Sequence, residues 1–248
     1  MEYLKVMSYN IHSGIGRDGK YDLERIAEVI RSENPDIVAL QEIDVGLKKS
    51  HFDNQPNLLA AELNYYSYFC LTRVTERGTY GILTLSRFPI IEKQKYDLSF
   101  GSDLEPRGIS KIITEPNLNN ILNVYNIHLG LRVRERAYQR RRMLSESILL
   151  EQNGKYPKII MGDFNDRVIS VVHGKLQRYF IDIFNFLRIK KRSTFSWKKI
   201  ALRLDHIYVN HQLKPVDAYV LKNKLTNQAS DHYPLIGILE LKNGRYHN

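Results

Sequence analysis

The chain has 248 residues, of which 43% are apolar and 26% are charged. This composition is typical of a folded globular protein and leaves little room for long disorder. No apolar run is long enough to cross a bilayer, and no secretory signal is visible at the start of the sequence. The lone Cys70 excludes an internal disulfide framework and a cysteine-rich zinc site. We therefore expect one cytoplasmic domain over residues 1–248.

The net charge of +10 is concentrated in two segments. Residues 131–142 contain six arginines and one glutamate, and residues 188–203 contain seven lysines and arginines and no acid. Localised positive charge indicates an anionic polymer or an anionic membrane surface as a partner. A solvated basic face explains such runs at least as often, so charge alone does not assign a function.

Predicted strands and helices alternate along the chain. Short runs of branched residues predict buried strands at 4–10 and 37–42. Between them, apolar residues at helical spacing predict a helix at 22–33, with Asp22 as its N-cap and Asn34-Pro35 as its end. A short helix is predicted at 57–63 and the longest helix at 133–151. Further strands are predicted at 81–86, 109–114, 121–127, 158–161, 204–209, 218–221 and 235–240.

The tetrapeptide Tyr-Asn-Ile-His occurs twice, at 9–12 and 125–128, each time at the end of a predicted strand. Each copy is followed by a predicted helix and by an apolar strand that leads into acidic residues, at 37–44 and 159–166. The copies are too far apart for a solenoid repeat. We therefore expect an α/β protein with two similar halves, whose sheets pack face to face with the helices outside.

Polar side chains gather at the ends of these apolar strands. Alternate residues of a strand lie on one face, so residues two apart project together. Three such pairs are Asn10 with His12, Asn126 with His128, and Asp163 with Asn165. Gln41-Glu42, Asp205-His206 and Asp231-His232 lie at further strand boundaries. Taken singly, each is more often a turn or capping residue. Taken together, they indicate a polar active site with a hard metal ion.

Six motifs that follow one another along the chain resemble those of the endonuclease/exonuclease/phosphatase superfamily. They are most similar to those of a bacterial branch whose substrate is unassigned. They are MSYNIH (7–12), LQEID (40–44), YNIHLG (125–130), GDFND (162–166), RLDHIYV (203–209) and SDHYPL (230–235). The resemblance extends from Met7 to Leu239. It implies a four-layered α/β sandwich built from two similar halves, which agrees with the repeated tetrapeptide.

The resemblance implies a role for each matched residue. Glu42 and Asn10 would hold Mg²⁺, with Mn²⁺ as an alternative, and Asp231 would add a second carboxylate near the metal. Mg²⁺ suits so sparse a ligand set because it keeps several waters. Asp163 would orient or deprotonate the attacking water, and Asn165 would contact the phosphate beside it.

Two histidines complete the site that the resemblance implies. His232 would stabilise the charge that develops on phosphorus, while Asp205 holds its imidazole in one tautomer. Asn126 and His128 match an Asn-x-His motif whose members bind phosphate or assist the leaving group. Arg107 is either a further phosphate-binding residue or a structural turn arginine.

One position departs from the pattern of the deoxyribonuclease branch. Tyr80 stands where that branch has a second glutamate, and Glu76 is a nearby candidate to replace it.

The sequence thus predicts a Mg²⁺-dependent phosphoester hydrolase and favours a phosphodiesterase or nuclease that activates water. A hydrolase of phospholipids or inositol phosphates is the alternative. A non-catalytic module that binds nucleic acid or membrane is less favoured, because such a module would not need the whole motif set. Nucleic acid is slightly favoured as the partner over an anionic membrane surface. No obligate protein partner is indicated.

Overall fold

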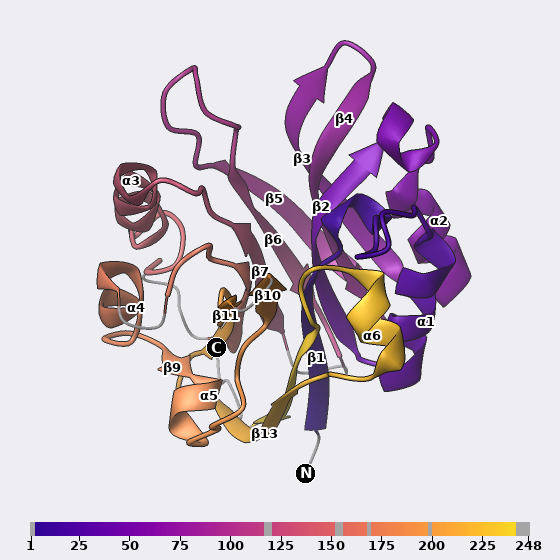
Figure 1. Ribbon diagram of the computed structural model, residues 1–248. Coiled ribbons are helices and arrows are strands. Elements are labelled where there is room, and N and C mark those ends of the chain that lie inside the picture. Colours follow the sequence, from indigo (N-terminus) through magenta and orange to yellow (C-terminus); the bar gives the residue numbers. More distant parts are fainter. Residues whose placement is uncertain (1–2, 117–120, 152–155, 168–169, 198–199, 242–248) are drawn as a thin grey trace.

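Two six-stranded sheets form the centre of the computed structural model, which describes residues 3–116, 121–151, 156–167, 170–197 and 200–241 (Figure 1). The first sheet contains, in spatial order, β13 (Leu213–Val220), β14 (Leu235–Leu241), β1 (Tyr3–Asn10), β2 (Ile37–Val45), β4 (Gly78–Ser86) and β3 (Tyr66–Thr75). The second contains β5 (Ile90–Asp97), β6 (Gly108–Thr114), β7 (Leu122–His128), β8 (Lys158–Asp163), β12 (Asp205–Val209) and β9 (Ile181–Asp182). A separate pair consists of β10 (Phe195–Trp197) and β11 (Ile200–Leu202). Both large sheets are mixed, because β1–β2 and β7–β8 are parallel pairs among antiparallel ones.

The helices lie outside the two sheets (Figure 1). They are α1 (Leu23–Glu33), α2 (Gln55–Leu63), α3 (Val133–Met143), α4 (Val171–Leu176), α5 (Ile183–Phe186) and α6 (Lys224–Ala229), with two 3-10 turns, η1 (His12–Gly14) and η2 (Lys48–Ser50). Within the described ranges, no helix is long and apolar enough to span a membrane.

Three buried apolar clusters correspond to the contacts between four layers. Val6 of β1 and Ile112 of β6 belong to the cluster between the sheets. Ile26 of α1 packs with Val38 of β2 on the outer face of the first sheet, and Met143 of α3 belongs to a third cluster on the second sheet. Each such buried side chain contributes about 1.5–3 kcal/mol by leaving water. The predicted α/β sandwich is therefore confirmed.

The repeated tetrapeptide marks two equivalent strand–helix–strand units. The first copy ends β1, which is followed by α1 and the parallel strand β2, with Asn10 opposite Gln41. The second copy ends β7, which is followed by α3 and the parallel strand β8, with His128 opposite Asp163. Asp22 caps α1 as predicted, because its side chain accepts a hydrogen bond from the backbone N–H of Arg25. Each unit thus delivers polar strand ends to the same edge of the sandwich.

Gly162 permits the close approach of β7 and β8. Its φ is +148°, and a Cβ atom at this position would lie 1.9 Å from the carbonyl oxygen of Ile127. Glycine is the residue that tolerates such a backbone without a clash. The neighbouring Asp163 is thereby brought level with His128.

The prediction of a helix over 133–151 is wrong beyond Met143. The chain leaves the helix at Leu144, and Ile148 and Leu149 are buried beside Tyr125 in the cluster on the second sheet. The hydroxyl of Tyr125 also donates a hydrogen bond to the carbonyl oxygen of Ile148. Burial of these two side chains therefore favours a turn over about two further turns of helix.

Candidate active site

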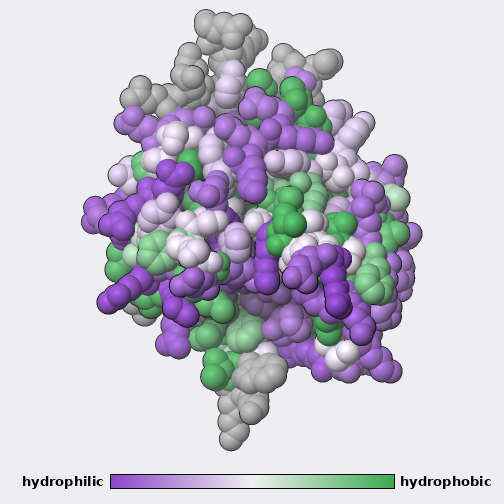
Figure 2. All heavy atoms as spheres, turned by 90° about the horizontal axis from the view of Figure 1, so that it is seen from above, coloured by the Kyte–Doolittle hydropathy of each residue, from purple (hydrophilic) through white to green (hydrophobic). Residues whose placement is uncertain are grey.

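The predicted polar residues meet at one end of the sandwich, around a pocket of about 700 Å³. Figure 2 views the molecule from this end and shows mainly hydrophilic side chains with smaller hydrophobic patches between them. Seven predicted site residues line the pocket: Glu42, Arg107, His128, Asp163, Asn165, Asp231 and His232. They come from both sheets and from the loops that follow their strands, so the pocket requires both halves of the fold.

A β-bulge aims Glu42 into this pocket. The register between β2 and β4 shifts between Leu40 and Ile43, and Glu42 has a φ of +61°. A positive φ in a residue other than glycine costs about 1–3 kcal/mol and persists only where the surroundings enforce it. The bulge lets Gln41 point between the sheets while the adjacent Glu42 lines the pocket.

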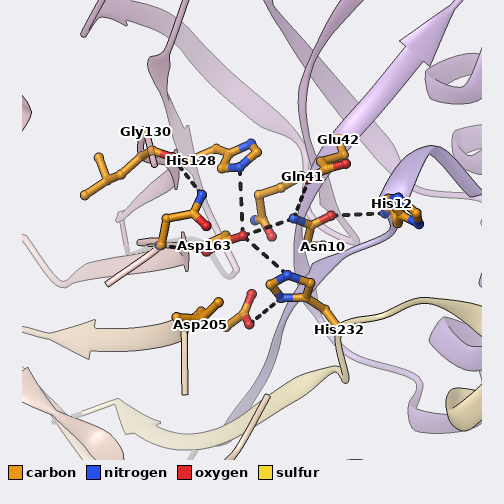
Figure 3. A network of polar contacts seen from close by, with 12 residues as sticks. Asn10, His12, Gln41, Glu42, His128, Gly130, Asp163, Asp205 and His232 are labelled. Atoms are coloured by element: carbon orange, nitrogen blue, oxygen red, sulfur yellow. Dashed lines mark hydrogen bonds and ion pairs between the residues drawn. The ribbon is translucent and has the colours of Figure 1, made fainter. Parts of the chain in front are cut away.

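Asn10 joins the two sheets at the floor of the site (Figure 3). Its amide nitrogen donates hydrogen bonds to Oε1 of Glu42 and to Oδ2 of Asp163, each over 3.0 Å. Its oxygen accepts a hydrogen bond from the backbone N–H of His12. Asn10 therefore positions Glu42 and Asp163 through its amide nitrogen, while its role as a metal ligand stays a prediction.

Asp163 is buried at the centre of the site. Besides Asn10, the backbone N–H of Asn165 donates to Oδ1 over 2.8 Å. Oδ2 lies 3.8 Å from Nε2 of His128 and 3.7 Å from Nε2 of His232. Burial, which disfavours the charged form, raises the pKa of Asp163 to about 7, although the nearby His232 opposes this shift. A carboxylate with such a pKa suits a general base near neutral pH.

His232 is held as an imidazolium between two carboxylates. Its Nδ1 lies 2.8 Å from Oδ2 of Asp205, and its Nε2 faces Asp163. Burial by itself would lower the pKa of His232, but the carboxylates of Asp205 and Asp163 outweigh it and raise the pKa to about 10. Thr194 in turn fixes Asp205, because its buried hydroxyl oxygen accepts the backbone N–H groups of Leu204 and Asp205.

His128 is the opposite case, a neutral imidazole. Burial first, and then the positive charges of Arg107 and His232, hold the pKa of His128 well below its usual value. Nη1 of Arg107 lies 3.0 Å from Nδ1 of His128. The same Nη1 lies 3.3 Å from Nε2, and because a guanidinium only donates, the nearer Nδ1 is the better placed acceptor. Arg107 also pairs with Glu105 over 2.7 Å, so it both lines the pocket and orients His128.

Asn126, predicted as a phosphate-binding residue, is not among the residues that line the pocket. Its side chain is fully buried between the sheets. Its amide nitrogen donates to the carbonyl oxygens of Leu40 and Leu83, and its oxygen accepts from the side chain of Gln41 over 2.8 Å. All of these partners belong to the other sheet, so Asn126 joins the two sheets and has no group left for a substrate.

Several pocket residues were not predicted. Lys49, Arg73 and Glu105 line the pocket, as does Tyr80. Glu76 is exposed and is not among the pocket residues, so it does not take the place of the glutamate that Tyr80 replaces. Lys49 and Glu105 belong to no polar strand-end motif, so apart from their charge no sequence pattern marks them as pocket residues.

The carboxylates of Glu42 and Asp231 are the groups that fit a hard divalent cation. Both line the pocket, and within the described ranges neither is paired with a lysine or arginine. Two carboxylates with room for water and a phosphate oxygen are the donor set that Mg²⁺ prefers. Asp163, Asp205 and His232 also lie within 4.8 Å of one another. A metal ion bound by this second cluster would have to replace the proton that Asp205 and Asp163 stabilise on His232.

Comparison with known proteins agrees with this geometry. A model of the Endonuclease/Exonuclease/phosphatase family matches residues 7–232. The Escherichia coli K12 protein YbhP is 31% identical over 248 residues, with 96% of each chain covered. A conserved protein of Enterococcus faecalis V583 shares the fold with a TM-score of 0.80 and 20% identity, over 96% of this chain and 100% of that one. The mannosyl-6-phosphatase Bt3783 of Bacteroides thetaiotaomicron gives a TM-score of 0.73 and 20% identity, over 96% and 100%. The chain belongs to the Endonuclease/Exonuclease/phosphatase family.

Proposed function

We propose that this protein is a divalent-metal-dependent phosphodiesterase that activates water for attack on phosphorus. The family consists of hydrolases that act on phosphoesters, which gives the reaction class. The observation that carries the proposal is the setting of Asp163, a buried carboxylate held by Asn10 and placed between two imidazoles in different protonation states. Carboxyl and imidazole groups whose environments separate their pKa values are typical of acid–base catalysis.

Each side chain has a part in this reaction. Asp163 takes a proton from the attacking water as the new oxygen–phosphorus bond forms. His232, as an imidazolium, stabilises the negative charge that develops on the phosphoryl oxygens, and the leaving oxygen takes a proton from water after its bond to phosphorus breaks. The neutral His128 donates a hydrogen bond from Nε2 to a phosphoryl oxygen, with Asn165 beside it.

Glu42 and Asp231 would hold the metal ion. When bound, Mg²⁺ or Mn²⁺ supplies positive charge that neutralises a nonbridging oxygen and the developing charge on the leaving group. Asn10 orients Glu42 for this task through its hydrogen bond to Oε1.

A nucleic acid is the favoured substrate because the excess positive charge is localised. Action in the cytoplasm is part of the same proposal and agrees with the free, buried Cys70. A phospholipid headgroup is a second candidate, supported by apolar side chains at the pocket. Leu131 lines the pocket and is 72% exposed, and Val74, which is 71% exposed, lies between two residues that line it. The similar mannosyl-6-phosphatase adds phosphate monoesters to the substrates worth testing.

A substrate panel tests the proposal. Bis-p-nitrophenyl phosphate, p-nitrophenyl phosphate, single-stranded and plasmid DNA, inositol phosphates and phospholipid vesicles would each be incubated with Mg²⁺, Mn²⁺ or EDTA. We expect metal-dependent cleavage of the diester and of DNA. Turnover of monoesters alone, or turnover that persists in EDTA, would contradict the proposal. Cleavage of vesicle phospholipid without cleavage of DNA would establish the second candidate.

A further inference from the structure

A second, strongly basic pocket lies beside the active site. Its volume is about 790 Å³, and six of its ten lining residues are lysine or arginine while none is acidic. The six are Arg167, Lys190, Lys191, Arg192, Arg203 and Lys222. Lys198 and Lys199, from the same basic segment of the sequence, lie outside the described residues. Cations gathered in a concave site create a positive potential that concentrates anions.

Within the described ranges, five of these six cations have no carboxylate partner that would explain them as structural ion pairs. Among the described residues, only Arg203 of the six pairs with a carboxylate. Arg192 donates to the amide oxygen of Asn185, and Lys222 donates to the hydroxyl of Ser193. Both of these acceptors are neutral, so the positive charge of the pocket is not cancelled. Like charges held close together repel, and an anionic ligand would remove this cost.

Arg203 is a fixed cation in the wall of the basic pocket. Its side chain is 2% exposed, and its Nη2 pairs with Oδ1 of Asp182 over 2.7 Å. Its guanidinium also lies over the ring of Phe184, 4.7 Å from the centroid. These contacts hold Arg203 in place, so it contributes a rigid part of the pocket lining.

The basic pocket and the active site share a dividing wall, the β10–β11 pair and the residues beside it. Ser193 lines the basic pocket and Phe195 lines the active site. On the returning segment, Leu202 and Arg203 line the basic pocket and Leu204 lines the active site. Residues two apart in an extended chain are separated by about 7 Å. A ligand with phosphate groups on neighbouring units is therefore of a size to reach both pockets.

We propose that the basic pocket is a second phosphate-binding site, which holds a neighbouring backbone phosphate of a single-stranded nucleic acid whose scissile diester lies beside Asp163. This inference rests on the proposed phosphodiesterase function. A flexible single strand is favoured because it can bend over the dividing wall to place phosphates in two separate hollows. Most of the binding free energy would come from phosphate contacts and would fall with added salt.

A charge-matched pair of variants separates this pocket from diffuse surface charge. The first variant is the triple replacement Lys190→Ala, Lys191→Ala and Lys222→Ala, at exposed positions in the basic pocket. The control is the triple replacement Lys20→Ala, Lys95→Ala and Lys224→Ala, at exposed positions that line neither pocket. Both lose the same charge, so only the place of the loss differs.

Binding of a short fluorescein-labelled single-stranded DNA would be measured by fluorescence anisotropy in EDTA, over a range of salt concentrations. Each phosphate contact to a single strand contributes about 0.7 to the slope of log affinity against log salt. We expect the pocket variant to bind at least ~10-fold more weakly at low salt, with a slope smaller by about 2. The control variant should bind as the unmodified protein does, and both variants should hydrolyse bis-p-nitrophenyl phosphate at the unmodified rate.

Each other outcome is decisive. Equal weakening in the two variants would overturn the inference in favour of diffuse charge. Unchanged DNA binding with lost binding to phosphatidylserine vesicles would overturn it in favour of a membrane surface. Binding of inorganic phosphate to the pocket would be followed by ³¹P line broadening. If phosphate binds there without displacing the DNA, the pocket is a site for the free ion only, and the inference is overturned. If no phosphoester is hydrolysed but the two variants still differ, the proposed function fails and the binding site stands.

Discussion

The imidazole of His232 contacts Oδ2 of Asp205 through Nδ1 over 2.8 Å while its Nε2 faces Oδ2 of Asp163 at 3.7 Å. The ring therefore lies between Asp205, which contacts one ring nitrogen, and Asp163, which faces the other. Because both neighbours are anionic when ionised, the ring is stabilised in its charged form. His128 also lies near Asp163, but its other neighbour is the cation Arg107 and not a second carboxylate. The two histidines therefore differ in charge at neutral pH.

This difference in charge can be observed directly in metal-free protein. We expect the ¹⁵N signals of His232 to show a doubly protonated ring at neutral pH, with deprotonation near pH 10, and those of His128 to show a neutral ring. The replacement Asp205→Asn removes the carboxylate that most raises the pKa of His232, so this ring should lose its proton at lower pH. Long-range ¹H–¹⁵N correlation spectra provide the measurement. An unchanged titration of His232 in Asp205→Asn would show that Asp205 does not set its charge.

Asp163→Asn removes the base while it keeps the shape of the side chain. We expect turnover of bis-p-nitrophenyl phosphate to fall at least ~10²-fold, the typical contribution of a general base. In the unmodified protein, turnover should rise as pH increases through about 7, because burial raises the pKa of Asp163 and only the deprotonated carboxylate accepts a proton. It should fall again as His232 deprotonates toward pH 10. Exposed Asp103→Asn is the control, and near-normal turnover in Asp163→Asn would remove Asp163 from the mechanism.

Glu42→Gln tests the metal site. The neutral amide is a poorer ligand for Mg²⁺, so the Mg²⁺ concentration for half-maximal activity should rise at least ~10-fold. Loss of Mn²⁺ binding in isothermal titration calorimetry would give the same answer without any substrate. Glu105→Gln is a suitable comparison, since Glu105 also lines the pocket but pairs with Arg107. Equal Mn²⁺ affinity in the Glu42→Gln and unmodified proteins would place the ion elsewhere.

Asn126→Leu should affect stability far more than chemistry. The replacement removes three hydrogen bonds between the sheets and leaves buried carbonyl oxygens without donors. We expect the free energy of unfolding, measured in urea, to fall by about 2–4 kcal/mol. Exposed Asn57→Leu should change it by less than about 0.5 kcal/mol. A stable Asn126→Leu protein with greatly reduced turnover would instead support the predicted phosphate contact of Asn126.

Gly162→Ala should be among the most damaging small substitutions in the chain. The new methyl group would overlap the carbonyl oxygen of Ile127, so β7 and β8 would have to separate. Little folded protein is expected by circular dichroism. Gly174→Ala in α4, where nothing lies within 4 Å of the added atom, should be neutral or stabilise the helix by up to about 1 kcal/mol. A folded, active Gly162→Ala protein would show that the strand pair can relax.

The sequence predicted the central strands better than the edges. Strands such as β2 and β8 are buried on both faces and contain short apolar runs. Strands β3 and β5 lie at the sheet edges, and much of their surface is exposed, so no long apolar run marks them. The six-residue helices α4 and α6 are too short to show a repeated helical pattern of apolar residues, so the sequence did not predict them either.

The two copies of the tetrapeptide show that a sequence motif alone does not predict which side chains reach the active site. Asn10 and Asn126 occupy the same place in their motifs, and both are predicted as site residues. Asn10 does reach it, whereas Asn126 meets Gln41 in the space between the sheets. Only the packing of one sheet on the other separates the two cases, and a local motif carries no information about that packing. The same holds for Lys49, which reaches the pocket from η2, and for Glu105, which reaches it from the loop before β6.

The contact between Gln41 and Asn126 has a consequence for how activity arises during folding. Glu42 follows Gln41 in the first sheet, and His128 lies two residues after Asn126 in the second. When only one sheet has formed, the chain holds either Glu42, the carboxylate for the metal, or Asp163, the base. The two come within working distance only when both sheets are in place. Catalysis should therefore appear last during refolding, in step with docking of the sheets and after their secondary structure. A pair of separately expressed halves should be inactive until they associate, which makes turnover a reporter of assembly.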